Sequence, residues 1–184
     1  MKKVSFIAMK EGTKEEYLFL DKLEKEYIAG TGERIIKYLR KYNETIEGYQ
    51  VSRLEHSLQA ATRALKDKAS DEMVVATLLH DIGDDLAPAN HAEYAAAILK
   101  PYVSEKTHWI LLKHGEFQMV YYAHHLGADK NKRDKYKDHK YYNDCVKFCE
   151  LWDQSSFDPN YKSLKLEVFE PLIKKIFSRK PYTS

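Results

Sequence analysis

Histidine and aspartate residues are spaced along this chain in a pattern suited to metal binding. The sharpest part of the pattern is the dipeptide His80-Asp81, which directly follows the apolar run Met73 to Leu79. A carboxylate at the end of such a run is costly to bury unless a cation pairs with it, and adjacent His and Asp side chains supply nitrogen and oxygen donors to one cation. Alone, the dipeptide fits equally well a helix end with a bonded imidazole and a solvated aspartate.

Four more residues extend the pattern: His56, His91, His114 and Asp153. Each belongs to a different predicted segment, so that imidazole and carboxylate groups arrive from separate parts of the chain. Four imidazoles and two carboxylates, one of them able to bridge, are the donors that a site with two ions about 3.5–4 Å apart requires. Without a thiolate, the set suits Fe, Mn, Co or Zn. His124 or His125 is an alternative for one of the ligands.

The order His, His-Asp, His, His, Asp resembles the ligand order of HD-domain metalloproteins, over about residues 49–153. Gln59, three residues after His56, is similar to a glutamine of the mixed-valent diiron oxygenases, the PhnZ-like phosphonate-cleaving enzymes and myo-inositol oxygenase; hydrolytic HD proteins usually lack it. The resemblance implies one iron held by His56, His80, Asp81 and Asp153, and another held by the bridging Asp81 with His91 and His114. It also implies an Fe(II)/Fe(III) pair that uses O2 to cleave a small molecule at a hydroxyl-bearing carbon.

Three positions that hold the phosphonate in those relatives carry other residues here, namely Asp84, Gln118 and Glu150. On α-helices, Gln118 lies one turn after His114 and Glu150 one turn before Asp153, so we expect both to face the metal cavity, together with Asp84. Free carboxylates there would repel a dianion and favour a neutral or cationic hydroxylated substrate, unless a nearby Lys or Arg pairs with them. The sequence thus predicts three substrate-binding residues.

Catalytic roles are expected for Asp81, Gln59 and Tyr49. Asp81 would bridge the metals, and Gln59 lies one helical turn from His56, within reach of a metal or of a ligand's second ring nitrogen. Tyr49 corresponds to a position that covers the open iron in the resembled oxygenases. The alternatives are a surface amide for Gln59 and an ordinary core or surface tyrosine for Tyr49, one of 14 in the chain.

Three functions fit these residues: a diiron oxygenase, a phosphohydrolase that uses Mn, Co or Zn on a phosphate ester or nucleotide, and a catalytically silent metal-binding module. A hydrolase needs cations around its phosphate group, whereas the matched pocket positions are acidic or neutral. We therefore expect O2 and a small molecule as the partners, with the hydroxyl group of that molecule introduced by a separate hydroxylase. The oligomeric state stays open.

The elements that position these residues are predicted to form an all-α, single HD-domain bundle over residues 1–184. Only 7 Gly and 5 Pro interrupt long segments rich in Leu, Ala, Lys and Glu. Two packing helices are expected within residues 1–45, the first opened by a capping box of Thr13 and Glu16. Further helices are expected at 50–68, 71–79, 90–97, 104–112, 117–126 and 141–153, and a C-terminal helix at 164–177 with a kink or break at Pro171.

Composition sets the remaining expectations. A formal charge of +2 gives no general attraction to nucleic acid, and the mixed charges of residues 129–140 are typical of a solvated loop. The longest stretch without a charged residue, 117–128, is too short to cross a membrane, and no secretory leader precedes the first helix, so a cytoplasmic protein is expected. Cys145 and Cys149 are expected to be buried free thiols.

Overall fold

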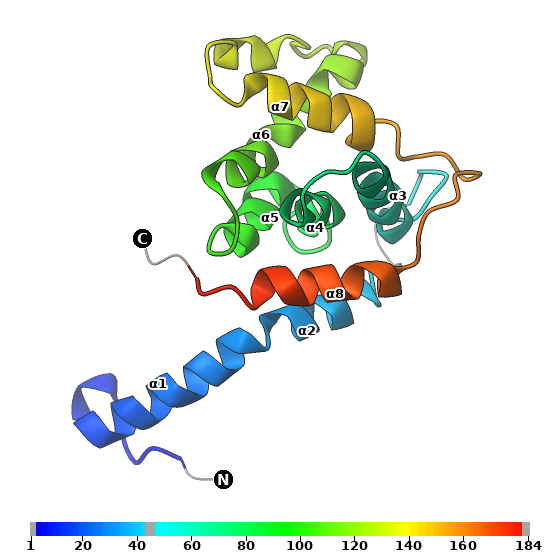
Figure 1. Ribbon diagram of the computed structural model, residues 1–184. Coiled ribbons are helices and arrows are strands. Elements are labelled where there is room, and N and C mark those ends of the chain that lie inside the picture. Colours follow the sequence, from blue (N-terminus) through cyan, green and yellow to red (C-terminus); the bar gives the residue numbers. More distant parts are fainter. Residues whose placement is uncertain (1–2, 43–46, 182–184) are drawn as a thin grey trace.

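The computed structural model describes residues 3–42 and 47–181, and all regular secondary structure in these residues is helical (Figure 1). This confirms the all-α prediction. The α-helices are α1 (Lys14–Ala29), α2 (Thr31–Leu39), α3 (Arg53–Lys66), α4 (Asp71–Leu79), α5 (His91–Leu99), α6 (Glu105–Tyr122), α7 (Tyr142–Lys147) and α8 (Leu166–Phe177). Shorter elements are the 3₁₀ helices η1 (Met9–Glu11), η2 (Ala123–Leu126) and η3 (Lys132–Tyr136), and the π-helix η4 (Phe148–Asp153).

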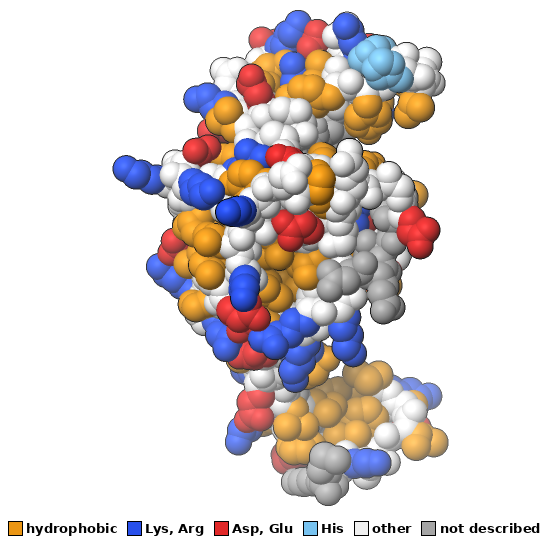
Figure 2. Space-filling view, turned by 90° about the vertical axis from the view of Figure 1, so that its right-hand side faces the viewer, with side chains coloured by type: hydrophobic (Ala, Val, Ile, Leu, Met, Phe, Trp, Pro, Cys, Tyr) orange, Lys and Arg blue, Asp and Glu red, His pale blue; other side chains and the backbone are white. Residues whose placement is uncertain are grey.

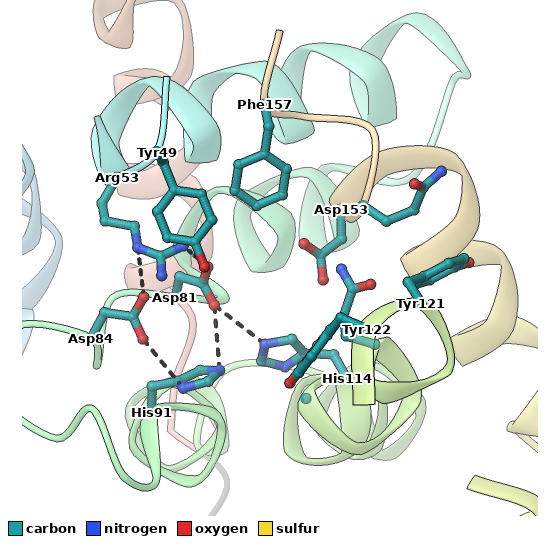
Figure 3. Close-up of a pocket in the computed structure, with 13 residues that line it drawn as sticks. Tyr49, Arg53, Asp81, Asp84, His91, His114, Tyr121, Tyr122, Asp153 and Phe157 are labelled. Carbon is teal, nitrogen blue, oxygen red and sulfur yellow. Dashed lines mark hydrogen bonds and ion pairs between the residues drawn. The ribbon is translucent and has the colours of Figure 1, made fainter. Parts of the chain in front are cut away.

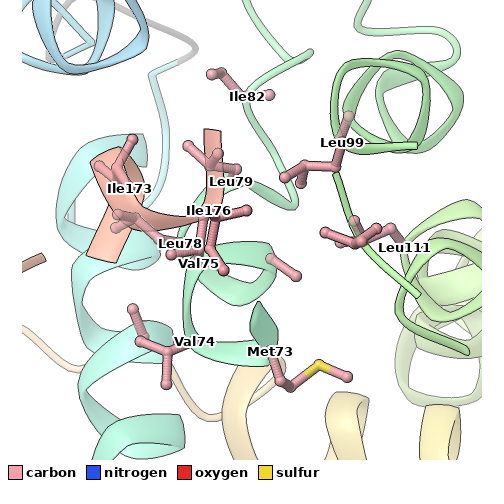
Figure 4. Packing of buried hydrophobic residues seen from close by; sticks show 14 of the residues in the cluster. Met73, Val74, Val75, Leu78, Leu79, Ile82, Leu99, Leu111, Ile173 and Ile176 are labelled. Carbon is pink, nitrogen blue, oxygen red and sulfur yellow. The ribbon is translucent and has the colours of Figure 1, made fainter. Parts of the chain in front are cut away.

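Helix α4 lies at the centre of the bundle, with α3, α6 and α8 packed around it. Every residue from Met73 to Leu79 is buried, because the helix has no polar face after the cap formed by Ser70. Figure 4 shows Val75, Leu78 and Leu79 close to residues of α8 and α6. A helix that is apolar on all sides must be buried in this way. The chain therefore leaves α4 in the interior, and the next two residues, His80 and Asp81, are buried as well.

Helix α8 closes one side of the bundle against α2 and α4. It buries Phe169, Ile173 and Ile176. Of the kink or break expected at Pro171, the break is wrong, since one helix runs through this residue. Pro171 is exposed, so water can bond the backbone carbonyl that the missing N–H leaves without a partner.

The N-terminal helices differ in how they pack. The capping box of Thr13 and Glu16 is present at the start of α1, as predicted. Helix α2 buries four residues against the bundle, but α1 buries none and projects away from it in Figure 1. Figure 2 shows hydrophobic side chains gathered on this projecting lobe, where Ile7, Leu18 and Tyr27 are exposed. Of the two expected packing helices, only the second packs on the core.

Helix α6 is a single element where two helices were expected, at 104–112 and 117–126. Gly115 lies within it without ending it. The helix carries His114 near its middle instead of at its end, and contacts α5 on one side and η4 on another. Although α6 is the longest helix of the described residues, neither it nor any other helix among them is long and apolar enough to cross a membrane.

Segment 129–140 is ordered around η3 rather than being a loop throughout. Its lysines pair with acidic groups on α6: Lys135 Nζ lies 2.6 Å from a carboxylate oxygen of Glu116, and Lys140 Nζ lies 2.8 Å from one of Glu105. Cys145 and Cys149 are buried free thiols, as expected. The Cys149 thiol donates to the carbonyl of His114 at 3.6 Å, so the α7–η4 segment packs directly on the part of α6 that carries this histidine.

Candidate metal centre

Six side chains converge between the helices. They are His56 of α3, His80 and Asp81 at the end of α4, His91 at the start of α5, His114 of α6 and Asp153 at the end of η4. All are buried except His91, whose side chain is 29% exposed. Figure 3 shows four of them around one cavity. The structure thus brings together all six residues that the sequence suggested as metal ligands.

Asp81 lies at the centre of this cluster. Its Oδ2 is 3.3 Å from Nε2 of both His56 and His80. Its Oδ1 is 3.4 Å from Nε2 of His114 and 3.5 Å from Nε2 of His91. The two carboxylate oxygens therefore face two different pairs of imidazoles, which is the arrangement of a carboxylate that bridges two cations.

Distances on the other side of the cluster also suit a metal ion. Asp153 Oδ1 lies 3.4 Å from Nε2 of both His56 and His80. Donor atoms about 2.1 Å from a shared ion are separated from one another by about 3.0–3.4 Å in tetrahedral or octahedral geometry. His56, His80 and Asp81 meet this spacing on one side, and Asp81, His91 and His114 come close to it on the other.

Backbone contacts fix the orientation of three imidazoles. The Nδ1 atoms of His56, His80 and His114 lie 2.9, 2.7 and 2.6 Å from the carbonyl oxygens of Ser156, Thr77 and Leu111. A carbonyl only accepts, so these Nδ1 atoms carry hydrogen, and Nε2 faces the cluster, where it either carries a proton or binds a metal ion. Nε2 of His56 and Nε2 of His80 are 3.1 Å apart. If both nitrogens present lone pairs, this distance requires a proton or a metal ion between them.

Electrostatics agree with a site that attracts positive charge. Burial disfavours the charged form of His80, but Asp81 and Asp153 outweigh it and hold the pKa of His80 well above its ordinary value. Burial would raise the pKa of both aspartates, yet His80 and hydrogen bonds from neighbouring histidines hold the pKa of each well below its usual range. The carboxylates therefore stay ionised, and their negative charge favours a cation at the cluster, either a proton on an imidazole or a metal ion.

A glycine lets α5 approach the His80-Asp81 turn. A Cβ atom added to Gly83 would lie 2.8 Å from both the Cα and the carbonyl oxygen of His91, and 2.9 Å from Cβ of Tyr94. Backbone atoms cannot move aside as a flexible side chain can. Only glycine at this position allows His91 to reach Asp81. In addition, the Tyr42 hydroxyl donates to the backbone carbonyl of Asp81 from the end of the α2 segment.

The π-helix η4 places Asp153 but not Glu150 in the site. Glu150 is exposed and is not among the residues that line the cavity. The expectation that it shares a face with Asp153 assumed α-helical geometry; the wider turn of a π-helix rotates residues three apart further from each other. Glu150 therefore does not share a face with Asp153, and the geometric argument that assigned it to substrate binding is wrong. Single π-helical turns of this kind occur frequently at functional sites.

Asp84 lines the cavity, as predicted, but both of its oxygens are bound by protein groups. Oδ2 lies 2.9 Å from Nε of Arg53, in an ion pair, and Oδ1 lies 3.2 Å from Nδ1 of His91. Burial and the nearby Asp81 raise the pKa of Asp84. The free negative charge expected from Asp84 is therefore not there, because Arg53 pairs with this carboxylate.

The cavity beside the cluster has a volume of about 330 Å³ and is lined largely by aromatic rings (Figure 3). Tyr121 and Tyr122 stand on one side, and Tyr49 stacks on Phe157 on the other with 5.1 Å between ring centroids. Tyr49 is 52% exposed. Gln118 also lines the cavity, where the sequence placed it. His124 and His125 are exposed, lie against each other with tilted rings and do not line the cavity.

Gln59 is fully buried, so the surface alternative for it is wrong. Its side-chain nitrogen donates to the carbonyl of Asp158 at 2.8 Å, and its Oε1 has no hydrogen-bond partner among the described residues. It does not bond the second nitrogen of His56, because Ser156 occupies that atom. Gln59 instead ties α3 to the segment that follows Asp153. Its catalytic role stays a prediction.

The residues that line the cavity but were not expected from the sequence include four with large side chains: Arg53, Tyr121, Tyr122 and Phe157. Helical spacing carried a signal for three of them. Arg53 lies one turn before His56, and Tyr121 and Tyr122 lie two turns after His114, so these side chains share a face with a histidine. Phe157 lies in a connection after η4, where no periodicity applies.

The part of the chain that contains this cluster matches the model of a known protein family. The family model described as HD domain matches residues 53–156, more than half of the 184 residues and a span that contains all six converging side chains. No curated protein matches the chain. A family match of this extent, together with a buried His/Asp cluster able to bind metal at the end of α4, shows that the chain belongs to the HD-domain family.

Proposed function

We propose that this HD-domain protein is a diiron oxygenase that uses O2 to cleave a small hydroxylated metabolite. The observation that carries the proposal is the orientation of Asp81, whose two oxygens face two pairs of imidazoles. One iron would be held by His56, His80, Asp81 and Asp153, and the other by Asp81, His91 and His114. Two bound irons would supply the sites that bind O2 and the substrate hydroxyl group, while the substrate would supply the electrons that reduce O2.

The residues around the second position shape where a substrate binds. His91 and His114 both line the cavity, so a substrate hydroxyl group that enters it lies next to this position. The aromatic rings of Tyr121, Tyr122 and Phe157 keep water from the substrate on the sides they cover. We assign to Gln118 a hydrogen bond to the substrate and to Tyr49, which stands over the cavity, the role of a lid.

Charge in the cavity limits the class of substrate. Arg53 is the only Lys or Arg among the described residues that line it, and this guanidinium lies 2.9 Å from Asp84 and 3.5 Å from Asp81. No cation is left to hold a phosphonate group, and aromatic rings favour an apolar or cationic moiety. We therefore propose a neutral or cationic metabolite whose hydroxyl group is introduced by a separate hydroxylase.

An assay of two reactions on the same protein tests this proposal. Iron-loaded, partly reduced protein is expected to consume O2 only when a small α-hydroxylated compound is added. The His114→Ala variant should lose this activity, whereas His124→Ala, which replaces an exposed histidine outside the cavity, should keep it. The oxygenase is contradicted if O2 uptake is absent and the Mn or Co form hydrolyses phosphomonoesters or nucleotides at about 1 per second or faster, an ordinary enzyme rate.

A further inference from the structure

His91 is held differently from the other three histidines of the cluster. Those three bond backbone carbonyls of Thr77, Leu111 and Ser156. The Nδ1 atom of His91 instead lies 3.2 Å from a side-chain carboxylate, that of Asp84. His91 is also the most exposed member of the cluster. Its orientation therefore depends on one replaceable side chain.

Asp84 is itself fixed from the other side. The guanidinium of Arg53 forms an ion pair with its second oxygen, with 2.9 Å between Nε and Oδ2, and lies over the ring of Tyr49 with 4.6 Å to the centroid. The side chains of Asp84 and Arg53 are only 9% and 12% exposed. Figure 3 shows Asp84 between Arg53 and His91 at one side of the cavity, with dashed lines to both. A carboxylate with a guanidinium at one oxygen and an imidazole at the other has little freedom to rotate.

A carboxylate on Nδ1 has two effects on a metal-binding imidazole. It keeps the hydrogen on Nδ1, so that Nε2 presents its lone pair toward Asp81, and it makes Nε2 a stronger donor. Loss of such a partner typically lowers metal affinity by about 10–100-fold. Here only the position formed by Asp81, His91 and His114 depends on it, because the imidazoles of the other position are held by the backbone.

We propose that Asp84, held by Arg53, is a positioning residue that sets the affinity of the second metal position, and that this position fills after the first. The inference rests on the proposed dinuclear site. It assigns to Asp84 a role in orienting His91 in place of the substrate contact that the sequence suggested. The backbone-anchored, buried position of His56, His80 and Asp153 takes the first ion.

Titration of the metal-free protein with Co(II), followed by calorimetry and by the visible absorption of bound cobalt, tests the proposal. The unmodified protein is expected to bind two ions in two separate steps. Asp84→Ala should weaken the second step by about 10–100-fold and leave the first nearly unchanged. Asp84→Asn keeps an oxygen that accepts from Nδ1 of His91, so its second step should weaken by only about 3-fold.

Two comparisons separate positioning from charge and from damage to the fold. Asp85→Asn removes a carboxylate from the adjacent, exposed residue, which accepts from the Tyr38 hydroxyl at 2.8 Å, and should leave both steps unchanged. Thermal unfolding of each metal-free variant checks that the fold is intact. The proposal is overturned if Asp84→Asn and Asp84→Ala have the same effect as each other and each weakens the first step as much as the second. Asp84 would then act only through its negative charge on both metal positions.

The remaining outcomes are also decisive. Two steps that neither Asp84 variant changes overturn the positioning role while leaving the dinuclear site in place. A single bound ion in the unmodified protein overturns both this inference and the dinuclear basis of the proposed function. Two steps of which only the second responds, and responds far more to alanine than to asparagine, support the proposal.

Discussion

Replacement of Asp81 by asparagine is expected to remove the bound metal pair and to lower turnover by about a thousandfold or more. Among the residues that the structure describes, Asp81 alone has oxygens that face all four histidines. An amide offers a single neutral oxygen, so it cannot bridge two cations or balance their charge. Metal ions contribute several kcal/mol to the transition states they stabilise, which corresponds to a rate factor of this size. Metal content and turnover are the two measurements.

The control for this prediction is Asp85→Asn, which changes an exposed carboxylate four residues further along the same turn. It should keep both metal content and turnover. An Asp81→Asn protein that retains two ions per chain would contradict the bridging role. Unfolding of the two variants without metal shows whether a loss of binding comes from the site or from the fold.

Gly83→Ala is expected to lower the free energy of unfolding by about 3 kcal/mol, the upper part of the range for overpacked cores. The new Cβ would lie 2.8 Å from backbone atoms of His91. Helix α5 must then move away from the His80-Asp81 turn, which also carries His91 away from Asp81. For a protein of this length, the melting temperature should fall by about 6–12 °C. Thermal and denaturant unfolding of the metal-free protein measure the effect.

Gly115→Ala is the matched comparison, because it introduces the same methyl group within α6. The nearest atom to that Cβ is Nε2 of His91 at 3.8 Å, an ordinary contact distance. Alanine also favours a helix interior over glycine by up to about 1 kcal/mol, so the metal-free Gly115→Ala protein should be as stable as the parent or more stable. If both variants lose stability to the same extent, close packing at Gly83 is not the cause.

Local patterns predicted the centre of the molecule well. Residues 71–79 form α4 with the predicted bounds, because a polar cap before an uninterrupted apolar run has only one stable outcome in a helical bundle. The six converging side chains were also found from residue type and spacing. Imidazole and carboxylate donors are few in a helical core, and a buried group of them must be paired or bound to a cation.

The parts that could not be predicted depend on contacts between distant residues or on departures from regular geometry. Arg53 and Asp84 are 31 positions apart, so their ion pair, which changes the expected role of Asp84, is visible only in the fold. The π-helical turn moved Glu150 away from the face on which regular spacing had placed it. Helix α1 has a capping box and apolar side chains, yet these local features do not indicate whether a partner surface exists in the same chain.

The most direct test of the central claim is the iron content and electron paramagnetic resonance of the iron-loaded, partly reduced protein. Two irons per chain and a signal from a coupled Fe(II)/Fe(III) pair are predicted, because in the proposed site the two oxygens of Asp81 would hold both ions to one carboxylate. The same signal should be absent from Asp81→Asn. A single iron per chain, or an isolated Fe(III) signal at full loading, would contradict the diiron site.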